Sequence, residues 1–358
     1  MKLCWLTTVA APYTIRLFEE IGKKIDLCVV MEDKKEEHRN DEWKIEGSSR
    51  FKMYVIDDDY HKKIKELAEE YDVLVDGYYL SRYGYMAVSE FKKRGKKTVM
   101  AADGGIPKDR GLIINRIMSY LMKRHDHFLS SSEVTDRYFL YYGVKEERIA
   151  HYRFTSLTEE DINNNSALIK KRDELRKELG LDDSFMILSV GQPIDRKGFD
   201  ILLHSYIESG LGDRCKIFII GGKPQDKILK IISDNDMNNV IFPGLLRSDE
   251  LRKYYACADL FVLCTREDIW GLVIQEAMSY GLPVISSDNC VAAEHFAKLD
   301  DSVVICRNED ERDYGEQIRK VFEDPEYRKD LSAKALVQVG SYTIENSAKD
   351  IINDLSLL

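Results

Sequence analysis

Short apolar runs alternate with amphipathic stretches along most of this 358-residue chain. Each apolar run has the length of a strand buried on both faces, and the stretches between the runs repeat apolar residues every three or four positions, as a helix does. A regular alternation of strand and helix predicts an α/β fold with parallel, doubly wound sheets. The main predicted strands are residues 1–9, 26–31, 51–56, 73–76, 97–101, 128–131, 185–190, 216–220, 240–242, 260–263, 284–286 and 302–306.

The stretch from residue 260 to residue 287 is the most informative of these units. A run of strand length leads through a charged loop into a predicted helix at 270–280, which Gly281-Leu282-Pro283 ends. Gly271 lies in the first turn of this predicted helix. Glycine there lets another group approach the backbone, and the free N–H groups favour an anion such as phosphate.

Glu276 is the second unusual residue of this helix. It lies on the same side as residues of core type, yet a carboxylate is rarely buried without a partner. A sugar with two adjacent hydroxyls would be a suitable partner, since an ionised carboxylate accepts hydrogen bonds from both.

A second motif follows the strand predicted at 185–190. Gly191 opens a loop that ends in Arg196-Lys197-Gly198 at the start of a helix. A strand, a glycine-containing loop and a lysine at a helix start form a phosphate-binding arrangement. Arginine and lysine neutralise a diphosphate, and arginine does so in bidentate fashion.

Together the two motifs resemble the signature of family-4 retaining glycosyltransferases, also called glycosyl transferases group 1. The downstream signature is an acidic residue, an aromatic–Gly pair, then Glu-Ala-Met and Gly-x-Pro-Val-Ile. It is matched by Asp268, Trp270-Gly271, Glu276-Ala277-Met278 and residues 281–285. The family's first acid is usually Glu, and here Glu267 stands directly before Asp268. In the upstream motif Lys197 matches the family's Lys, whereas Gln192 stands where the family has Arg.

The resemblance implies two Rossmann-like domains that face each other across a cleft, the GT-B arrangement. It places an N-terminal, acceptor-binding domain at 1–165 and a C-terminal, nucleotide-sugar-binding domain at 180–340, with a linker around 158–180. The C-terminal helix within 341–358 is expected to cross back to the first domain.

The resemblance also implies roles for individual residues. Lys197, Arg196 and the amides of Gly271 and Leu272 would stabilise the departing diphosphate without a metal. Glu276 would hold the ribose, and Asp268 or Glu267 the donor sugar. Further expected contacts are Gln192 at the diphosphate, Gly222 and Leu245 at the nucleotide, and Asp103 at the position where the family often carries a catalytic His.

The implied reaction moves a sugar from a UDP- or GDP-linked donor to a glycan or lipid-linked acceptor in surface polysaccharide synthesis. No further cofactor is expected. Two other hypotheses remain open: a nucleotide-sugar epimerase on the same fold, which would need acid/base residues that the sequence does not clearly show, and a non-catalytic scaffold subunit, which Gln192 and Asp268 would suit.

Charge and cysteine content limit the classes of function and the cellular compartments that suit the chain. A net charge of −10 argues against a general nucleic-acid binder. Seven scattered cysteines without a C-x-x-C pair indicate buried, reduced thiols and a cytosolic location, with the inner face of the cell membrane as one site of action. Residues 3–11 are interrupted by Thr7 and Thr8 and predict a first strand rather than a signal peptide. The charge-dense stretch 32–50 predicts an exposed excursion.

Two other clusters each allow two interpretations, and a pair of histidines does not suit a metal site. The basic amphipathic stretch 115–124, with the cations at 92–97, would suit anionic lipid, or be a core-packed helix with a solvated basic side. Asp57-Asp58-Asp59 would bind a metal, or cap the helix at 60–70, and we favour the cap. His125 and His127 lack further ligands at metal-binding spacing.

Overall fold

The chain divides into two compact units in the computed structural model. Unit 1 comprises Met1–Ser156 and Tyr342–Leu358, and unit 2 comprises Leu157–Ser341. The structure describes residues 1–8, 11–32, 48–181 and 183–358. The excursion predicted at 32–50 therefore lies outside the described residues except at its ends, as does the end of the first predicted strand.

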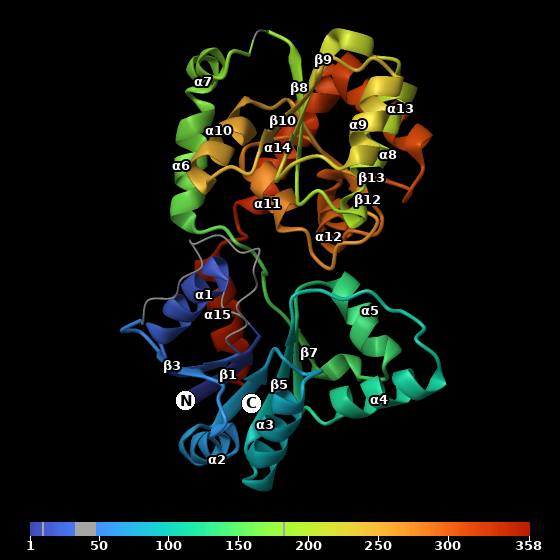
Figure 1. The fold of residues 1–358 in the computed structure, drawn as a ribbon. Coiled ribbons are helices and arrows are strands. Elements are labelled where there is room, and N and C mark those ends of the chain that lie inside the picture. The colour runs from blue at the N-terminus through green and yellow to red at the C-terminus, as the bar shows by residue number, and fades with distance from the viewer. Residues whose placement is uncertain (9–10, 33–47, 182) are drawn as a thin grey trace. The chain divides into compact units, whose positions relative to one another are not determined.

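Unit 1 contains a seven-stranded sheet in the order β3-β2-β1-β4-β5-β6-β7, and all its pairings are parallel. Helices connect most of the strands in sequence (Figure 1). The strands are β1 (Lys2–Thr7), β2 (Asp26–Met31), β3 (Lys52–Val55), β4 (Val73–Asp76), β5 (Lys97–Ala102), β6 (His127–Ser130) and β7 (Ile149–His151). The helices are α1 (Pro12–Gly22), α2 (Tyr60–Glu70), α3 (Arg82–Lys93), α4 (Leu112–Lys123), α5 (Glu133–Tyr141), the 3-10 turn η2 (Glu146–Arg148) and α15 (Ile344–Leu355).

Side chains that alternate along β1 fill both faces of the unit 1 sheet. Cys4 and Leu6 belong to the core cluster formed with α2 and α3. Trp5 points to the other face and contacts Phe18 of α1, with the ring centroids 5.4 Å apart. This period of two is what a strand covered on both faces requires.

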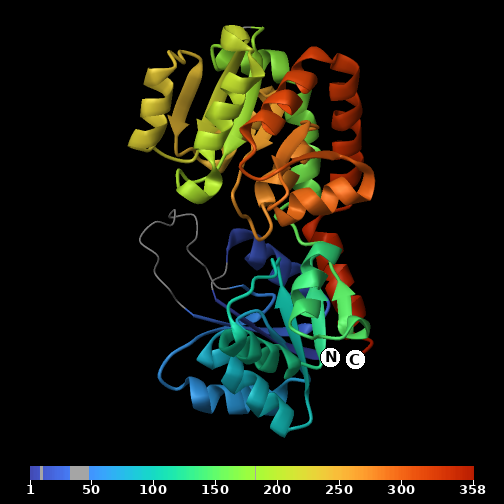
Figure 2. The same cartoon turned by 90° about the vertical axis from the view of Figure 1, so that its right-hand side faces the viewer.

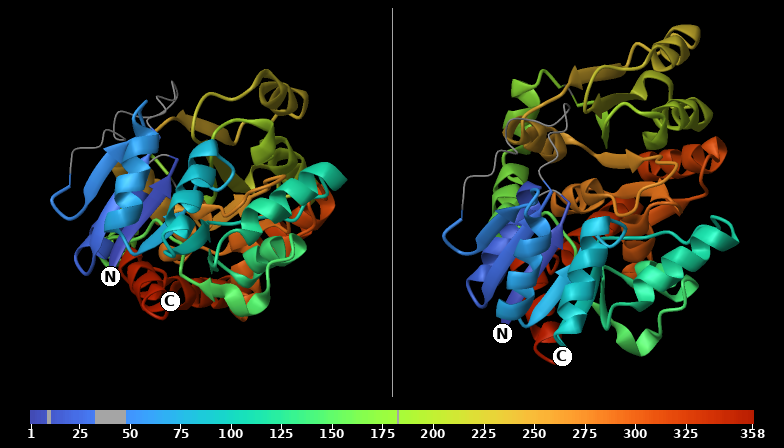
Figure 3. Two further views of the ribbon diagram at one scale, coloured as in Figure 1. Left: turned by 90° about the horizontal axis from the view of Figure 1, so that it is seen from below. Right: turned by 60° about the horizontal axis from the view of Figure 1, so that its bottom comes forward.

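The C-terminal helix α15 packs against α1 in unit 1 (Figures 1 and 3). His127 on β6 pairs with Asp354 of α15 at 3.0 Å, and Arg153 pairs with Asp350 at 3.4 Å. The two chain termini consequently lie near each other (Figure 2).

Unit 2 contains a six-stranded parallel sheet in the order β10-β9-β8-β11-β12-β13. Its strands are β8 (Phe185–Val190), β9 (Cys215–Ile220), β10 (Val240–Gly244), β11 (Leu260–Leu263), β12 (Val284–Ser287) and β13 (Val303–Cys306). The helices are α6 (Glu159–Ile169), α7 (Arg172–Glu178), α8 (Phe199–Ser209), α9 (Asp226–Asp234), α10 (Ser248–Cys257), α11 (Leu272–Ser279), α12 (Val291–Asp300), α13 (Glu311–Glu323) and α14 (Pro325–Val339), with 3-10 turns η3 (Asp195–Lys197) and η4 (Gly212–Arg214).

The core of unit 2 also has two sides. Ile187 of β8 and Leu260 of β11 pack against α8 and α13. Phe261 points the other way and contacts Tyr255 of α10, with the ring centroids 5.9 Å apart. The predicted α/β class with parallel, doubly wound sheets is confirmed in both units.

The linker suggested around 158–180 is not an irregular segment, because α6 and α7 occupy it and pack on α10. Thr158 and Asp161 form a capping box that starts α6, and Asp161 also pairs with Arg252. Asn165, although it stands in a polar run, is buried and donates to Ser279 Oγ at 2.8 Å.

Two further expectations need correction. The N-cap residue of α2, Asp59, makes no side-chain cap; Asp57 instead accepts a hydrogen bond from the Asp59 N–H at 3.0 Å. Of the five cations at 92–97, all except Lys97 pair with acids in the described part of unit 1, so these cations do not form a free basic face. These pairs are Lys92–Asp126, Lys93–Glu90, Arg94–Glu69 and Lys96–Asp72.

All seven cysteines are buried and unpaired. No helix in the described ranges combines the length and the apolar character needed to cross a bilayer.

Candidate functional site

The switch point of the unit 2 sheet lies between β8 and β11. Strands β9 and β10 lie on one side of β8, and β11, β12 and β13 lie on the other. Leu260 of β11 pairs in parallel with Ile187 of β8. The loops 191–198 and 264–271 therefore leave neighbouring strands at the same edge, where open α/β sheets bind ligands.

These two loops contact each other closely. The Arg196 carbonyl accepts from the Arg266 N–H at 2.8 Å and from Thr265 Oγ1 at 2.9 Å. Gly198 has φ +65°, and a Cβ there would lie 1.9 Å from the Cys264 carbonyl oxygen. Glycine at 198 thus permits both the left-handed turn and the close approach of the second loop.

Lys197, Arg196 and Asp268 meet where the loops touch. Lys197 Nζ lies 2.6 Å from Asp268 Oδ2, and Arg196 Nη1 lies 3.6 Å from the same oxygen. Arg196 Nη1 also donates to the Glu267 carbonyl at 2.7 Å. The structure therefore brings two cations and one carboxylate to a single point, and Glu267 contributes its backbone to it.

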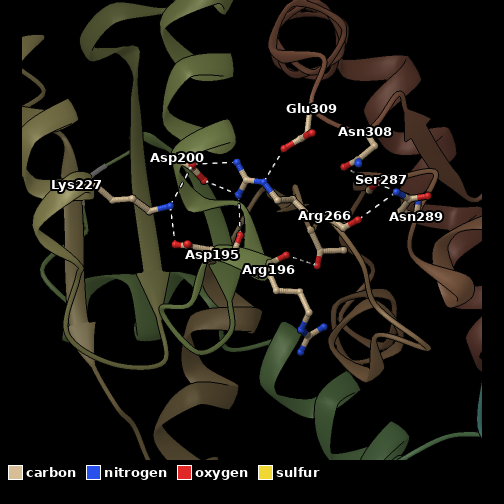
Figure 4. Close-up of polar contacts among 10 residues, drawn as sticks. Asp195, Arg196, Asp200, Lys227, Arg266, Ser287, Asn289, Asn308 and Glu309 are labelled. Carbon is tan, nitrogen blue, oxygen red and sulfur yellow. Dashed lines mark hydrogen bonds and ion pairs between the residues drawn. The ribbon is translucent and has the colours of Figure 1, made fainter. Parts of the chain in front are cut away.

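Arg266 contacts the loop 191–198 and the start of α8 (Figure 4). Its Nη1 and Nη2 each lie 3.0 Å from a different carboxylate oxygen of Asp200, and Nη1 also donates to the Asp195 carbonyl at 2.6 Å. Its Nε lies 2.7 Å from Glu309, and its own carbonyl accepts from Asn289 Nδ2 at 3.1 Å. One guanidinium thereby fixes η3, the first turn of α8 and the loop after β13.

The charges in this network shift the ionisation of Asp200. Burial by itself would raise the pKa of its carboxyl, but the hydrogen bonds and charge of Arg266, together with Lys227, outweigh burial and lower the pKa to about 2. Lys227 Nζ lies 3.3 Å from Asp200 and 2.7 Å from Asp195, whose pKa it also lowers. Both aspartates are therefore held as carboxylates.

Gly271 does not lie in the first turn of α11 but directly before it. The helix begins at Leu272, two residues later than the sequence suggests, and Gly271 is the N-cap with φ +98°. A Cβ at Gly271 would lie 2.7 Å from Cys290 Sγ, which explains why this position suits glycine. The amides of Gly271 and Leu272 are at the start of the helix, as a phosphate-binding role requires.

Glu276 is half-buried and has an ordered partner. Tyr255 of α10 donates its hydroxyl to Glu276 Oε2 at 3.0 Å, and the Tyr255 ring stacks on Tyr280 with centroids 5.4 Å apart. Burial and the Glu276 charge raise the pKa of Tyr255 well above its usual range, so the phenol remains a donor. Glu276 lies about 6 Å along the axis from the first residue of α11.

Three other predicted contacts lie on the loops after β8, β9 and β10. Gln192 and Leu245 are exposed, and Gly222 has φ +150° beside the Pro193 ring. The loops are joined through backbone hydrogen bonds from Gly191 to Ile220 and from Gly221 to Gly244. Among the described residues, neither Gln192 nor Leu245 makes a hydrogen bond or an ion pair with Lys197.

Asp103 belongs to unit 1, where it follows β5. Tyr152 donates its hydroxyl to Asp103 Oδ1 at 2.9 Å. Its role at the acceptor stays a prediction.

Within the described ranges, no three His, Cys, Asp or Glu side chains gather in a way that could hold a metal ion.

Residues 171–337 match the family model for glycosyl transferases group 1. This range contains β8 to β13 and both motif loops. Unit 2 is a glycosyl transferases group 1 domain. The resemblance drawn from Lys197 and from residues 268–285 is thereby confirmed.

Curated relatives of the group 1 domain match over part of their length. An alpha-galactosylglucosyldiacylglycerol synthase of Streptococcus pneumoniae is 32% identical over 124 residues, which are 32% of this chain and 32% of the relative. A D-inositol 3-phosphate glycosyltransferase of Catenulispora acidiphila is 27% identical over 184 residues, 48% of this chain and 44% of the relative. The chain thus spans a third to about half of the length of these relatives.

Solved structures match over the whole chain and establish the fold. Anabaena HepE in complex with UDP and glucose has a TM-score of 0.76 at 16% identity and covers 100% of both chains. A trehalose-6-phosphate protein of E. coli bound with UDP-2-fluoro glucose has a TM-score of 0.75 at 13% identity, covering 100% of this chain and 99% of its own. The predicted GT-B fold class is confirmed.

Sequence reasoning missed several residues around the group 1 motifs. From the sequence alone, Arg266 and Asp200 receive no role, although an Arg beside the acidic pair and an Asp just after Lys-Gly are signals of an ion pair. Tyr255 lies 21 positions before Glu276, and sequence spacing carries no sign of that contact.

Proposed function

We propose that the chain transfers a sugar, with retention at the anomeric carbon, from a UDP-linked donor to a glycan or lipid-linked acceptor. The observation that carries the proposal is the position of two cations at one carboxylate oxygen at the switch point of a group 1 domain: Lys197 Nζ lies 2.6 Å and Arg196 Nη1 3.6 Å from Asp268 Oδ2. Two cations suit a diphosphate, and a carboxylate suits sugar hydroxyls.

A uridine donor is favoured over a guanosine donor. HepE is described in complex with UDP-glucose, and the trehalose-6-phosphate protein with UDP-2-fluoro glucose. In this chain Glu276 would accept from the two ribose hydroxyls while Tyr255 holds its other oxygen. Gly222 and Leu245 would line the nucleotide, and Gln192 would hydrogen-bond the diphosphate.

The chemical step that this site supports breaks the bond between the anomeric carbon and the phosphate oxygen. The bonding electrons go to that oxygen, where Lys197, Arg196 and the amides of Gly271 and Leu272 stabilise the charge that develops. The acceptor oxygen attacks the same face of the sugar, and its proton passes to the departing phosphate. Asp268, with Glu267 beside it, would orient the sugar hydroxyls.

The acceptor side of the proposal rests on unit 1 and on the relatives. Two streptococcal relatives are named as synthases of glycosyl diacylglycerols, which supports a lipid-linked or surface glycan as acceptor. The sheet of unit 1 has its own switch point between β1 and β4, a suitable place for an acceptor. Asp103 is the carboxylate we assign to the acceptor hydroxyl, and we place the reaction in the cytoplasm at the inner face of the membrane.

The test is donor binding and hydrolysis with a panel of UDP- and GDP-sugars and no added metal. The variants are Lys197→Ala and Glu276→Ala, with Lys329→Ala on α14 as the control for loss of an exposed lysine. We expect one UDP-sugar to bind and to be hydrolysed slowly, with about a hundredfold loss of turnover in Lys197→Ala and unchanged turnover in the control. Absence of binding to every donor, or binding that survives both substitutions, would refute the site. Binding without any turnover would favour the scaffold hypothesis.

A further inference from the structure

Helix α4 presents apolar side chains to solvent. Leu112 is 82% exposed, Ile113 77%, Ile117 52% and Tyr120 58%. These residues lie within nine consecutive positions of one helix. Surface apolar residues normally occur singly, and a contiguous exposed group marks an interaction site.

The buried residues of α4 show which side of the helix packs against the rest of unit 1. Met118 and Met122 are buried in the cluster with Phe128 and Phe139 of β6 and α5. At about 100° per residue, Ile113, Ile117 and Tyr120 lie roughly opposite these methionines. The packed side contains Met118 and Met122, and Leu121 is half-buried beside it. Ile113, Ile117 and Tyr120 remain on the far side. We call Leu112, Ile113, Arg116, Ile117 and Tyr120 the outward face of α4.

The region around α4 carries predominantly positive charge. Between residues 108 and 124 there are five basic residues and one acidic residue, in a chain whose net charge is −10. Arg110, Arg116 and Lys123 are exposed. Among the described residues none of these three makes an ion pair, in contrast to the paired cations of α3. Unpaired cations beside apolar side chains complement an anionic and apolar surface.

The tyrosines at the edge of this region also suit a membrane interface. The Arg124 guanidinium lies 3.9 Å from the Tyr85 ring centroid and 6.0 Å from that of Tyr120. Tyrosine places its ring at the boundary between headgroups and acyl chains, and arginine beside it reaches lipid phosphate.

We propose that the outward face of α4 docks the protein on an anionic lipid bilayer, with the helix in the plane of the interface. Leu112, Ile113 and Ile117 enter the boundary of the acyl chains, and Arg110, Arg116 and Lys123 contact lipid phosphates. The purpose of this docking, delivery of a lipid-linked acceptor to unit 1, rests on the proposed function. The docking itself does not.

The first experiment measures binding of the full chain to vesicles of phosphatidylcholine with and without phosphatidylglycerol. We expect binding to the anionic vesicles only, and weaker binding as salt rises. Arg116→Glu should lower the affinity at least fivefold, and Ile113→Glu should abolish binding. The matched controls are Lys329→Glu and Val337→Glu on α14, where Lys329 is exposed and Val337 is 75% exposed. Both should bind as the wild type does.

The second experiment reports whether α4 enters the bilayer. Because all seven native cysteines are buried, Ile113→Cys adds a thiol that a polarity-sensitive dye can label selectively at the surface. The dye at 113 should shift to an apolar signal when anionic vesicles are added, whereas the same dye on Val337→Cys should not.

The other outcomes overturn the proposal. If the dye at 113 is already in an apolar environment without vesicles, α4 is covered by the protein itself or by a second copy, and light scattering distinguishes the two. Equal binding of Ile113→Glu and the wild type also refutes the docking. Donor hydrolysis measured without vesicles separates the two hypotheses. Binding of the wild type to anionic vesicles without hydrolysis in any variant refutes the proposed function alone. Hydrolysis by a wild type that does not bind vesicles refutes the docking alone.

Discussion

Lys197 Nζ lies 2.6 Å from Asp268 Oδ2, so the cation expected to hold the donor diphosphate is paired with the carboxylate expected to hold the donor sugar. Both side chains are largely buried, with 12% and 11% of their surfaces exposed. A diphosphate that binds Lys197 must compete with Asp268. We infer that donor binding transfers Lys197 from Asp268 to phosphate and frees the carboxylate for the sugar hydroxyls.

The first prediction separates the two roles of Asp268 with Asp268→Asn. The amide cannot compete for Lys197 as a carboxylate does, so UDP should bind more tightly, by about fivefold if the pair contributes about 1 kcal/mol. Turnover of the UDP-sugar should nevertheless fall about a hundredfold, because the sugar loses a charged acceptor in the transition state. Calorimetric titration with UDP and a hydrolysis assay check the two parts.

Asp288→Asn provides the control, since Asp288 lies on the loop after β12 and is exposed. That variant should match the wild type in both assays. Weaker UDP binding in Asp268→Asn would show that Asp268 holds Lys197 in place instead of competing for it.

The second prediction concerns Arg266 as a positioning residue. Arg266→Ala removes the bidentate contact to Asp200 and the contact to the Asp195 carbonyl, so η3 and its cations lose their support. Donor kcat/KM should fall about tenfold to a hundredfold, as expected for a misplaced binding group. UDP affinity should fall, whereas affinity for uridine, which has no phosphate, should remain.

Arg266→Lys should rescue little, because an ammonium cannot replace a planar bidentate group. Glu309→Ala removes only the exposed partner of Arg266 and should change kcat/KM less than twofold. Equal loss of uridine and UDP binding in Arg266→Ala would mean that the substitution disrupts the domain as a whole.

The third prediction is a pH dependence of stability at Asp200. Its folded pKa, about 2, is below the ordinary value of 3.8, so its contribution to stability is complete above pH 3.8 and declines as pH falls toward 2. The free energy of unfolding of the wild type should exceed that of Asp200→Asn by about 2 kcal/mol at pH 6 and by about 1 kcal/mol at pH 3. Urea titrations at several pH values measure this difference. A difference for Asp200→Asn that stays constant over this pH range would contradict the assignment.

The loops of the site could be predicted from the sequence, because local residue chemistry determines where they begin and end. Gly191, Lys197-Gly198 and Gly271 each follow a short apolar run, and parallel strands bring the loops after them to one edge. The contacts that hold the loops together could not be predicted from the sequence. Arg266 and Asp200 are 66 positions apart, and charged residues in loops are usually solvated.

The two largest departures have one physical cause, namely that residue type alone does not decide burial. Asn165 looks like a linker residue but is buried, because the capping box at Thr158 starts a helix there. Ile117 looks like a core residue beside Met118 but is exposed, because unit 1 covers only one side of α4. In both cases tertiary contacts, and not the type of residue, decide whether the side chain is buried.

The fourth prediction tests Glu276 and the tyrosine that supports it. If Glu276 accepts from both ribose hydroxyls, Glu276→Gln should weaken UDP binding about tenfold, the loss of a charged hydrogen bond. The wild type should prefer UDP over 2′-deoxy-UDP, and Glu276→Gln should bind both nearly equally.

Tyr255→Phe removes the hydroxyl that holds Glu276 Oε2 and should weaken UDP binding about threefold, with part of the preference retained. Tyr254→Phe is the matched control, since Tyr254 is on the same helix and packs on Phe218. A full preference for UDP in Glu276→Gln would assign the ribose to another residue, because removing the charged acceptor must reduce that preference if Glu276 holds the hydroxyls.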